Sequence, residues 1–113
     1  MDQDQVEVCR RFNVSFSAAD PFSKVGISEG ALQGEQPLNG LRHPPENGTC
    51  GWYIWSGPDF PLDDDEFFKP MHMSHLLQRC PAVLPYLGLP PGWRFLIAPD
   101  YEDVWFDPSL LDV

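Results

Sequence analysis

The stretch at residues 51–56, GWYIWS, decides the fold class because it carries the strongest strand signal in the first half of the chain. Its aromatic and β-branched side chains are of the kinds enriched in strands. Alternation along an extended backbone places Trp52, Ile54 and Ser56 on one side, and Tyr53 and Trp55 on the other. Since both sides are rich in apolar residues, the sequence predicts a central strand whose two faces are covered.

A helix is predicted before this strand, at the N-terminus. Residues 3–12, QDQVEVCRRF, place Val6, Cys9 and either Val8 or Phe12 near one helical face. Between this helix and the central strand, residues 24–28, KVGIS, predict a short strand. Residues 29–50 are rich in Gly, Pro, Asn and Gln, and they predict an ordered loop.

A pair of helices is predicted after the central strand. Residues 66–80, EFFKPMHMSHLLQRC, predict a helix that begins near Pro70, because proline suits the first turn of a helix. Residues 81–87 predict a second short helix, which ends at Gly88.

The C-terminal part predicts a β-hairpin with strands at residues 93–97 and 103–106. The order of these elements predicts an α+β fold, with a small and mainly antiparallel sheet, an N-terminal helix, a central helical pair and a final hairpin. A chain of 113 residues without repeats or linkers is expected to form a single domain, residues 1–113.

The chain is strongly acidic, with a formal net charge of −10 and a pI near 4.4. Seven acidic and four basic residues precede Gly57, whereas ten acidic and three basic residues follow Ser56. Such a charge argues against nucleic acid or an anionic membrane as the ligand, since both would repel it. It favours a basic protein partner, although solubility alone also accounts for it.

The densest acidic run lies between the central strand and the predicted helical pair, and a second acidic group surrounds the hairpin. The run allows three interpretations: a calcium site, a solvated loop beside a helix N-terminus, or a surface for a basic partner. It lacks the spacing of an EF-hand loop. The residues predicted to bind a partner are Asp59, Asp63, Asp64, Asp65, Glu66, Glu102 and Asp103.

The cysteines predict buried thiols in a reducing compartment. Cys9, Cys50 and Cys80 are odd in number, widely spaced and without a CxxC pair. The polar, acidic N-terminus MDQDQVEV does not resemble a signal peptide, and no apolar run approaches the roughly 20 residues of a membrane span. These features predict a cytoplasmic protein.

The histidines provide the main alternative to partner binding. His72 and His75 are three residues apart on a predicted helix, and His43 or Cys80 would be a third metal ligand. The pair lacks the glutamate of HExxH, and packing near the helix start is the simpler interpretation. No match to GxSxG, GxxxxGK[ST] or GxGxxG is present, so neither an enzymatic activity nor a cofactor is expected.

Four longer motifs resemble the bacterial immunity-protein family numbered thirty-three. They are NGLRHPP at 39–45, GWYIWSG at 51–57, DEFFKPMHMSHL at 65–76, and YLGLPPGWRFLIAPDYEDVWFD at 86–107. The resemblance implies a small α+β protein, encoded near polymorphic toxin systems, that binds and neutralises a cognate toxin. It brings no catalytic residues with it, and we expect Arg94 of the last motif to pair with an acid such as Glu102 or Asp103.

Three hypotheses follow from the sequence. The first is an acidic immunity protein that neutralises a bacterial toxin by stoichiometric occlusion. The second is a metal-binding protein or metalloenzyme that uses His72 and His75. The third is a small regulatory interaction module without a toxin partner.

Overall fold

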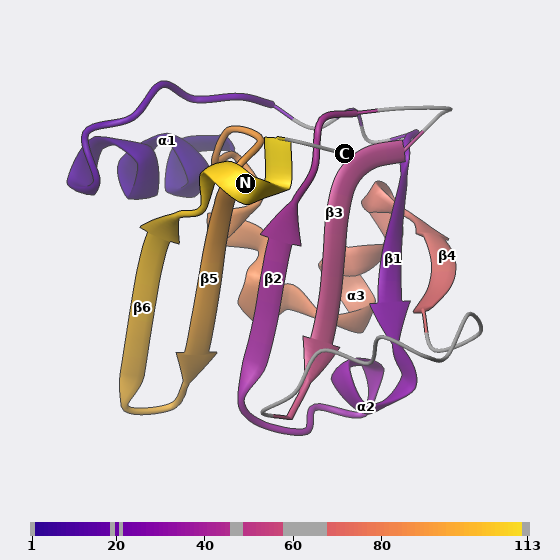
Figure 1. Ribbon diagram of the computed structural model, residues 1–113. Helices are drawn as coiled ribbons and strands as arrows, with labels where there is room; N and C mark the ends of the chain where they lie inside the picture. Colours follow the sequence, from indigo (N-terminus) through magenta and orange to yellow (C-terminus); the bar gives the residue numbers. More distant parts are fainter. Residues whose placement is uncertain (1, 19, 21, 46–48, 58–67, 112–113) are drawn as a thin grey trace.

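The computed structural model describes residues 2–18, 20, 22–45, 49–57 and 68–111. Six strands form one sheet in the order β4-β1-β3-β2-β5-β6 (Figure 1). The pair β1 and β3 is parallel, and every other neighbouring pair is antiparallel. The predicted α+β class with a mainly antiparallel sheet is therefore confirmed.

The strand β3 (Thr49–Ser56) lies inside the sheet, between β1 (Lys24–Ser28) and β2 (Leu38–Arg42). Its Trp52 and Ile54 belong to the main core, whereas Trp55 belongs to a smaller core on the opposite face, with Tyr53 packed against it. Both tryptophans are only 1% exposed. The predicted central strand with two covered faces is confirmed.

The prediction of a loop at residues 29–50 was wrong, because this segment contains the helix α2 (Glu29–Leu32) and the interior strand β2. All of β2 is buried. Gly40 makes this possible: a Cβ placed there would lie only 2.2 Å from the ring of Phe95 on β5 (Trp93–Ala98). The Asn39 side chain donates to the carbonyl of Gly57 at 2.7 Å, so this polar residue is satisfied inside the sheet.

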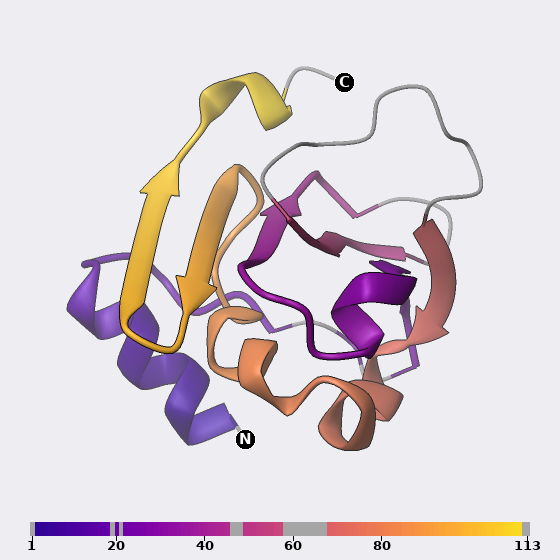
Figure 2. The same cartoon turned by 90° about the horizontal axis from the view of Figure 1, so that it is seen from below.

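Helices cover one face of the sheet (Figure 2). The helix α1 (Asp2–Arg11) packs against the 3₁₀ helix η2 (Pro81–Tyr86). The N-terminal helix is confirmed, but its predicted inner face needs one correction. Val6 is 37% exposed, while Gln5 is buried and donates from its amide to the Leu84 carbonyl at 2.9 Å.

The helix predicted to begin near Pro70 begins later, at Met73, so the predicted start was wrong. Residues 68–72 form the edge strand β4 (Phe68–His72), which is followed by the 3₁₀ helix η1 (Met73–His75) and the helix α3 (Leu76–Arg79). Proline lacks an N–H group, and an edge strand tolerates this as well as a first helical turn does. The second helix of the predicted pair is confirmed as η2.

The predicted C-terminal hairpin is confirmed and is slightly longer than expected. The strands β5 and β6 (Tyr101–Phe106) are joined at residues 99–100. After β6, the 3₁₀ helix η3 (Pro108–Leu111) turns back and buries Leu110 against the smaller core, beside Leu41 and Trp55. The hairpin thereby forms the end of the sheet opposite to β4 (Figure 1).

Arg42, at the end of β2, is a buried cation that joins three parts of the chain. Its guanidinium donates to the carbonyls of Cys50, Ser17 and Leu89 at 2.7–2.9 Å. The guanidinium also lies 5.7 Å from the Trp52 ring. Burial lowers the Arg42 pKa, and hydrogen bonds to carbonyl dipoles offset part of the cost of desolvation.

Candidate partner-binding site

The predicted acidic residues fall into two groups in the structure. Asp59, Asp63, Asp64, Asp65 and Glu66 lie outside the described residues. Glu102 and Asp103 are neighbours on β6, where successive side chains point to opposite faces of the sheet. The two acids therefore have different surroundings.

Glu102 is directed to the helix-covered face, where it joins three elements. Its carboxylate accepts from both terminal nitrogens of Arg11 on α1, at 2.9 Å each, and from the Tyr86 hydroxyl at 2.5 Å. The Arg11 and Tyr86 hydrogen bonds hold the pKa of Glu102 below its ordinary value. Burial, followed by the bond to Glu102, raises the pKa of Tyr86 to about 12. Glu102 thus stabilises the packing of α1 and η2 against β6.

Asp103 is directed to the opposite face and lies between two aromatic residues. Tyr101, Asp103 and Trp105 alternate along β6, so they share the face of the sheet opposite to α1 and η2, and we call them the β6 ridge. Tyr101 is 53% exposed, Asp103 is exposed and Trp105 is half-buried. Among the described residues, no hydrogen bond or ion pair engages the Asp103 carboxylate.

Arg94 supports the ridge from the neighbouring strand. Its guanidinium lies 5.3 Å from the Trp105 ring and 3.2 Å from a carboxylate oxygen of Asp107. The expected pairing of Arg94 with an acid is confirmed, but its partner is Asp107 and neither of the two named acids. Glu102 faces the other side of the sheet, where it binds Arg11.

Asp107 ends the hairpin and begins the turn into η3. Its second carboxylate oxygen accepts from the backbone N–H of Ser109 at 3.1 Å and from the Ser109 hydroxyl at 2.6 Å. These bonds, with Arg94 as a further contribution, lower the Asp107 pKa. Asp107 is therefore a structural anchor. Of Glu102 and Asp103, the two predicted acids that the structure describes, Asp103 is the one whose carboxylate is available to a partner.

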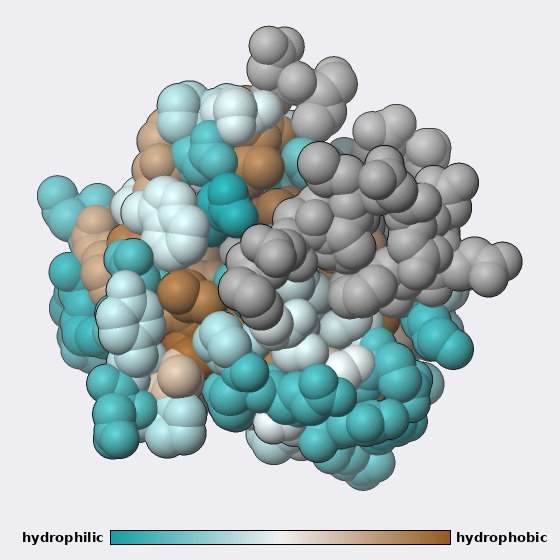
Figure 3. Space-filling view, turned by 60° about the horizontal axis from the view of Figure 1, so that its bottom comes forward, coloured by the Kyte–Doolittle hydropathy of each residue, from teal (hydrophilic) through white to brown (hydrophobic). Residues whose placement is uncertain are grey.

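Exposed apolar side chains also lie at the C-terminal end of the hairpin. Phe106 is 46% exposed at the end of β6, and Leu111 is 46% exposed in η3. Figure 3 shows brown apolar side chains lying among pale and teal ones on the side where β5 and β6 lie. Aromatic side chains beside a polar group are typical of the energetic centre of protein interfaces.

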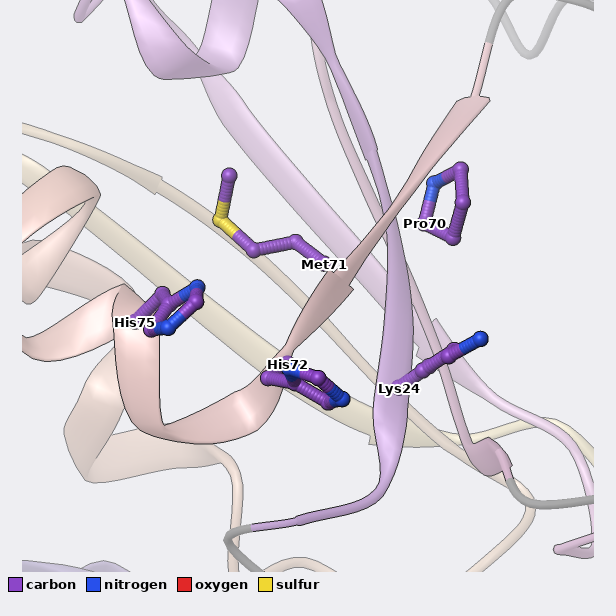
Figure 4. Close-up of a pocket in the computed structure, with 5 residues that line it drawn as sticks. All are labelled: Lys24, Pro70, Met71, His72 and His75. Carbon is purple, nitrogen blue, oxygen red and sulfur yellow. The ribbon is translucent and has the colours of Figure 1, made fainter.

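The two histidines of the alternative hypothesis line a hollow of about 240 Å³ at the other end of the sheet, with Lys24, Pro70 and Met71 (Figure 4). The rings of His72 and His75 lie 5.6 Å apart. His72 lies on β4 and not on a helix, so the predicted helical placement of this pair was wrong.

The proposed third metal ligands are engaged elsewhere. His43 lies 3.0 Å from the Leu110 carbonyl through Nδ1, and the buried Cys80 thiol contacts the Ala31 carbonyl. Within the part of the chain that the structure describes, no three His, Cys, Asp or Glu residues form a group that could hold a metal ion. Lys24, which also lines the hollow, would repel a cation. The geometry therefore does not favour the metal hypothesis.

The cysteines are all free and buried, as predicted. Burial raises the pKa values of Cys9 and Cys80, which is opposite to the shift that a nucleophilic thiolate needs.

Two features of this site were not predicted from the sequence. The first is the β6 ridge, although the alternation of Tyr101, Asp103 and Trp105 within a predicted strand is a usable signal. The second is the bond between Glu102 and Arg11, which are 91 residues apart and carry no local signal of pairing.

A protein-family model described as "Imm33-like domain" matches residues 4–107. The match extends from α1 to the end of the hairpin. No curated protein and no solved structure matches the chain. Over the described residues, no helix has the length and apolar character needed to cross a membrane.

Proposed function

Because the chain belongs to the Imm33-like domain family, we propose that it is an immunity protein, which binds a cognate bacterial toxin and neutralises it by stoichiometric occlusion. The family is the one that the sequence motifs resemble. The proposal treats residues 1–113 as one cytoplasmic domain that acts by binding and not by catalysis. Its partner is a basic protein surface, and neither nucleic acid nor membrane is a ligand.

The observation that carries this proposal beyond the family is the β6 ridge. An exposed carboxylate, Asp103, lies between Tyr101 and Trp105. The guanidinium of Arg94, on the neighbouring strand β5, packs against the ring of Trp105 and stabilises it. Tyrosine and tryptophan supply most of the binding energy in many interfaces, and an acid beside them selects a basic partner. We assign the centre of the interface to this ridge.

The acidic run Asp59, Asp63, Asp64, Asp65 and Glu66 is the second part of the proposed interface, on the ground of its charge. With a net charge of −10, the chain attracts a basic partner over distances of about one Debye length, roughly 8 Å at physiological salt. This attraction accelerates association more than it strengthens the final complex. Glu102 adds to the negative electrostatic potential of the chain, but its carboxylate already accepts hydrogen bonds from Arg11 and Tyr86.

The test is co-expression of the chain with the toxin encoded beside its gene, with growth of the host as the readout. We expect growth to be restored and the purified proteins to form a complex of defined stoichiometry in calorimetry. Continued toxicity, together with no complex at micromolar concentrations, would refute the proposal. Continued toxicity without a complex is also the result expected if the chain is a regulatory module without a toxin partner.

Three variants test the residue assignment. We expect Asp103→Asn to weaken binding about tenfold and Trp105→Ala to weaken it more, since central aromatic residues often contribute 2 kcal/mol or more, as a rough guide. The matched control is Glu35→Gln, which removes the same charge from an exposed residue that follows α2 in the sequence. The helix α2 lies at a distance from β6 (Figure 1). Equal effects of Asp103→Asn and Glu35→Gln would show that only the net charge matters.

A further inference from the structure

The outer edge of β6 is the feature of the sheet that the proposed function leaves without a role. We propose that this edge binds an extended, basic segment of the toxin, which extends the sheet by one strand through backbone hydrogen bonds. The inference rests on the proposed immunity function and adds a binding mode to it.

Among the strands that the structure describes, β6 is the last in the sheet order and pairs with β5 alone. One hydrogen bond shows which backbone groups of β6 point toward β5. The Asp107 N–H donates to the Gly92 carbonyl at 2.7 Å, and these two residues are the next opposed pair after Trp93 and Phe106. Antiparallel strands alternate between residues that bond to the neighbour and residues that do not. Tyr101, Asp103 and Trp105 therefore bond to β5, and the backbone groups of Glu102, Val104 and Phe106 point outward.

The opposite edge of the sheet is a poorer template. Its strand β4 contains Pro70, which has no N–H to donate, and exposed Lys69. Lys24 lies close by and would repel a basic segment. By contrast, β6 contains no proline, and each of its residues is exposed or half-buried.

Charge selects the occupant of the β6 edge. Asp100, Glu102 and Asp103 lie along the hairpin, so a second copy of this chain would place acids beside acids, and each copy carries a net charge of −10. A basic strand would instead find an exposed carboxylate, Asp103, on the face opposite to α1 and η2. Strand addition draws affinity from the backbone and specificity from alternate side chains. Here Tyr101 and Trp105 contact one face of the added strand, and Phe106 contacts the other.

The first experiment uses the whole chain and a blocked peptide of seven alternating lysine and valine residues. Hydrogen exchange of the backbone amides is followed by NMR, with and without the peptide. We expect the amides of Glu102, Val104 and Phe106 to exchange at least threefold more slowly when the peptide is bound. The amides of β4 should not change.

Two control peptides separate pairing from charge. One carries the same lysines but is N-methylated at alternate residues, so it cannot form a strand ladder, and the other has glutamate in place of lysine. Neither should protect the β6 amides. Equal protection by the N-methylated peptide, or no protection by the first peptide at saturating concentration, overturns the proposal.

The second experiment uses the toxin and separates this inference from the proposed function. Replacement of the Val104 amide by an ester removes one outward N–H and keeps every side chain. The ester also makes the Asp103 carbonyl a weaker acceptor for β5, so we expect the thermal unfolding midpoint to fall slightly and the affinity for the toxin to fall about tenfold. If the toxin is neutralised and the ester binds it as well as the amide does, edge pairing is wrong and the immunity function stands. If the peptide pairs with β6 but no toxin is neutralised, the edge site stands and the immunity function fails.

Discussion

Glu102 and Asp103 are adjacent carboxylates whose roles are set by the face of the sheet that each one occupies. Glu102 lies against Arg11 and Tyr86, whereas the Asp103 carboxylate is exposed on the opposite face of the sheet. The sequence predicted that both acids lie in the hairpin, but it did not predict that Glu102 pairs with Arg11. The Arg11 partner comes from a helix 91 residues away, and only the packing of that helix brings the two groups together.

The two carboxylates are expected to differ in their effect on stability. Glu102→Gln removes a bidentate ion pair and weakens the bond to Tyr86, so it should lower the free energy of unfolding by about 1 kcal/mol. Asp103→Asn should change it by less than about 0.5 kcal/mol, as is usual for an exposed substitution. Urea unfolding of the three proteins at pH 7 measures both effects, and a larger loss for Asp103→Asn would contradict the assigned roles.

The difference between the wild-type chain and Glu102→Gln should also depend on pH. The pKa of Glu102 in the folded chain lies below its ordinary value of 4.5. Its contribution to stability is therefore complete above pH 4.5 and is lost as the pH falls through the lowered pKa. A difference between the two unfolding free energies that stays constant down to pH 2 would show that Glu102 is not paired in solution.

Tyr86 gives a second titration in the alkaline range. Its pKa in the folded chain is about 12, against an ordinary value of 10. Tyr86→Phe keeps the ring stacked on Phe95 and removes the titrating hydroxyl. The absorbance difference between wild type and variant should show tyrosinate forming near pH 12, and the stability of the wild type relative to the variant should fall as the pH rises from 10 through 12. Ionisation of Tyr86 near pH 10 would contradict its burial and its bond to Glu102.

At the scale of elements, β2 is the largest difference between prediction and structure. The sequence around it is rich in Gly, Pro and Asn, which are typical of loops. In the sheet, Gly40 accommodates the Phe95 ring and the Asn39 amide bonds to a neighbouring backbone carbonyl. Both features depend on contacts with other strands, so a local pattern cannot reveal them. By contrast, β1, β3 and the hairpin carry alternating or β-branched sequences and were predicted.

Gly40 tests the packing of β2 against β5. Gly40→Ala places a Cβ 2.2 Å from the Phe95 ring, so we expect a loss of roughly 3 kcal/mol in the free energy of unfolding. The double variant Gly40→Ala/Phe95→Leu provides space for the methyl group. Its loss should be smaller than the sum of the two single losses by at least about 1 kcal/mol, as measured by a double-mutant cycle. Additive losses would place the Phe95 ring away from Gly40.

On the scale of the whole molecule, the reactivity of the cysteine thiols measures how often the buried core opens to solvent. Cys9, Cys50 and Cys80 are 2–5% exposed and belong to the main core, with Trp52 and Ile54. We expect all three thiols to react quickly with a thiol reagent in denaturant, and to react in the native chain only as fast as the core opens. Gly40→Ala should accelerate the native reaction in step with its loss of stability. Rapid reaction of one thiol in the stable wild type would place that cysteine at the surface.

The position of β2 between β3 and β5 has a consequence for the synthesis of the chain. The strands β1 to β4 leave the ribosome first, and at that stage one edge of the wholly buried β2 has no neighbour. Arg42 also lacks the Leu89 carbonyl until the last part of the chain is made. An unpaired apolar strand edge promotes aggregation of a nascent chain. Synthesis of the C-terminal hairpin therefore covers the free edge of β2 and removes this risk of aggregation. Chains truncated before residue 93 should depend on chaperones to remain soluble.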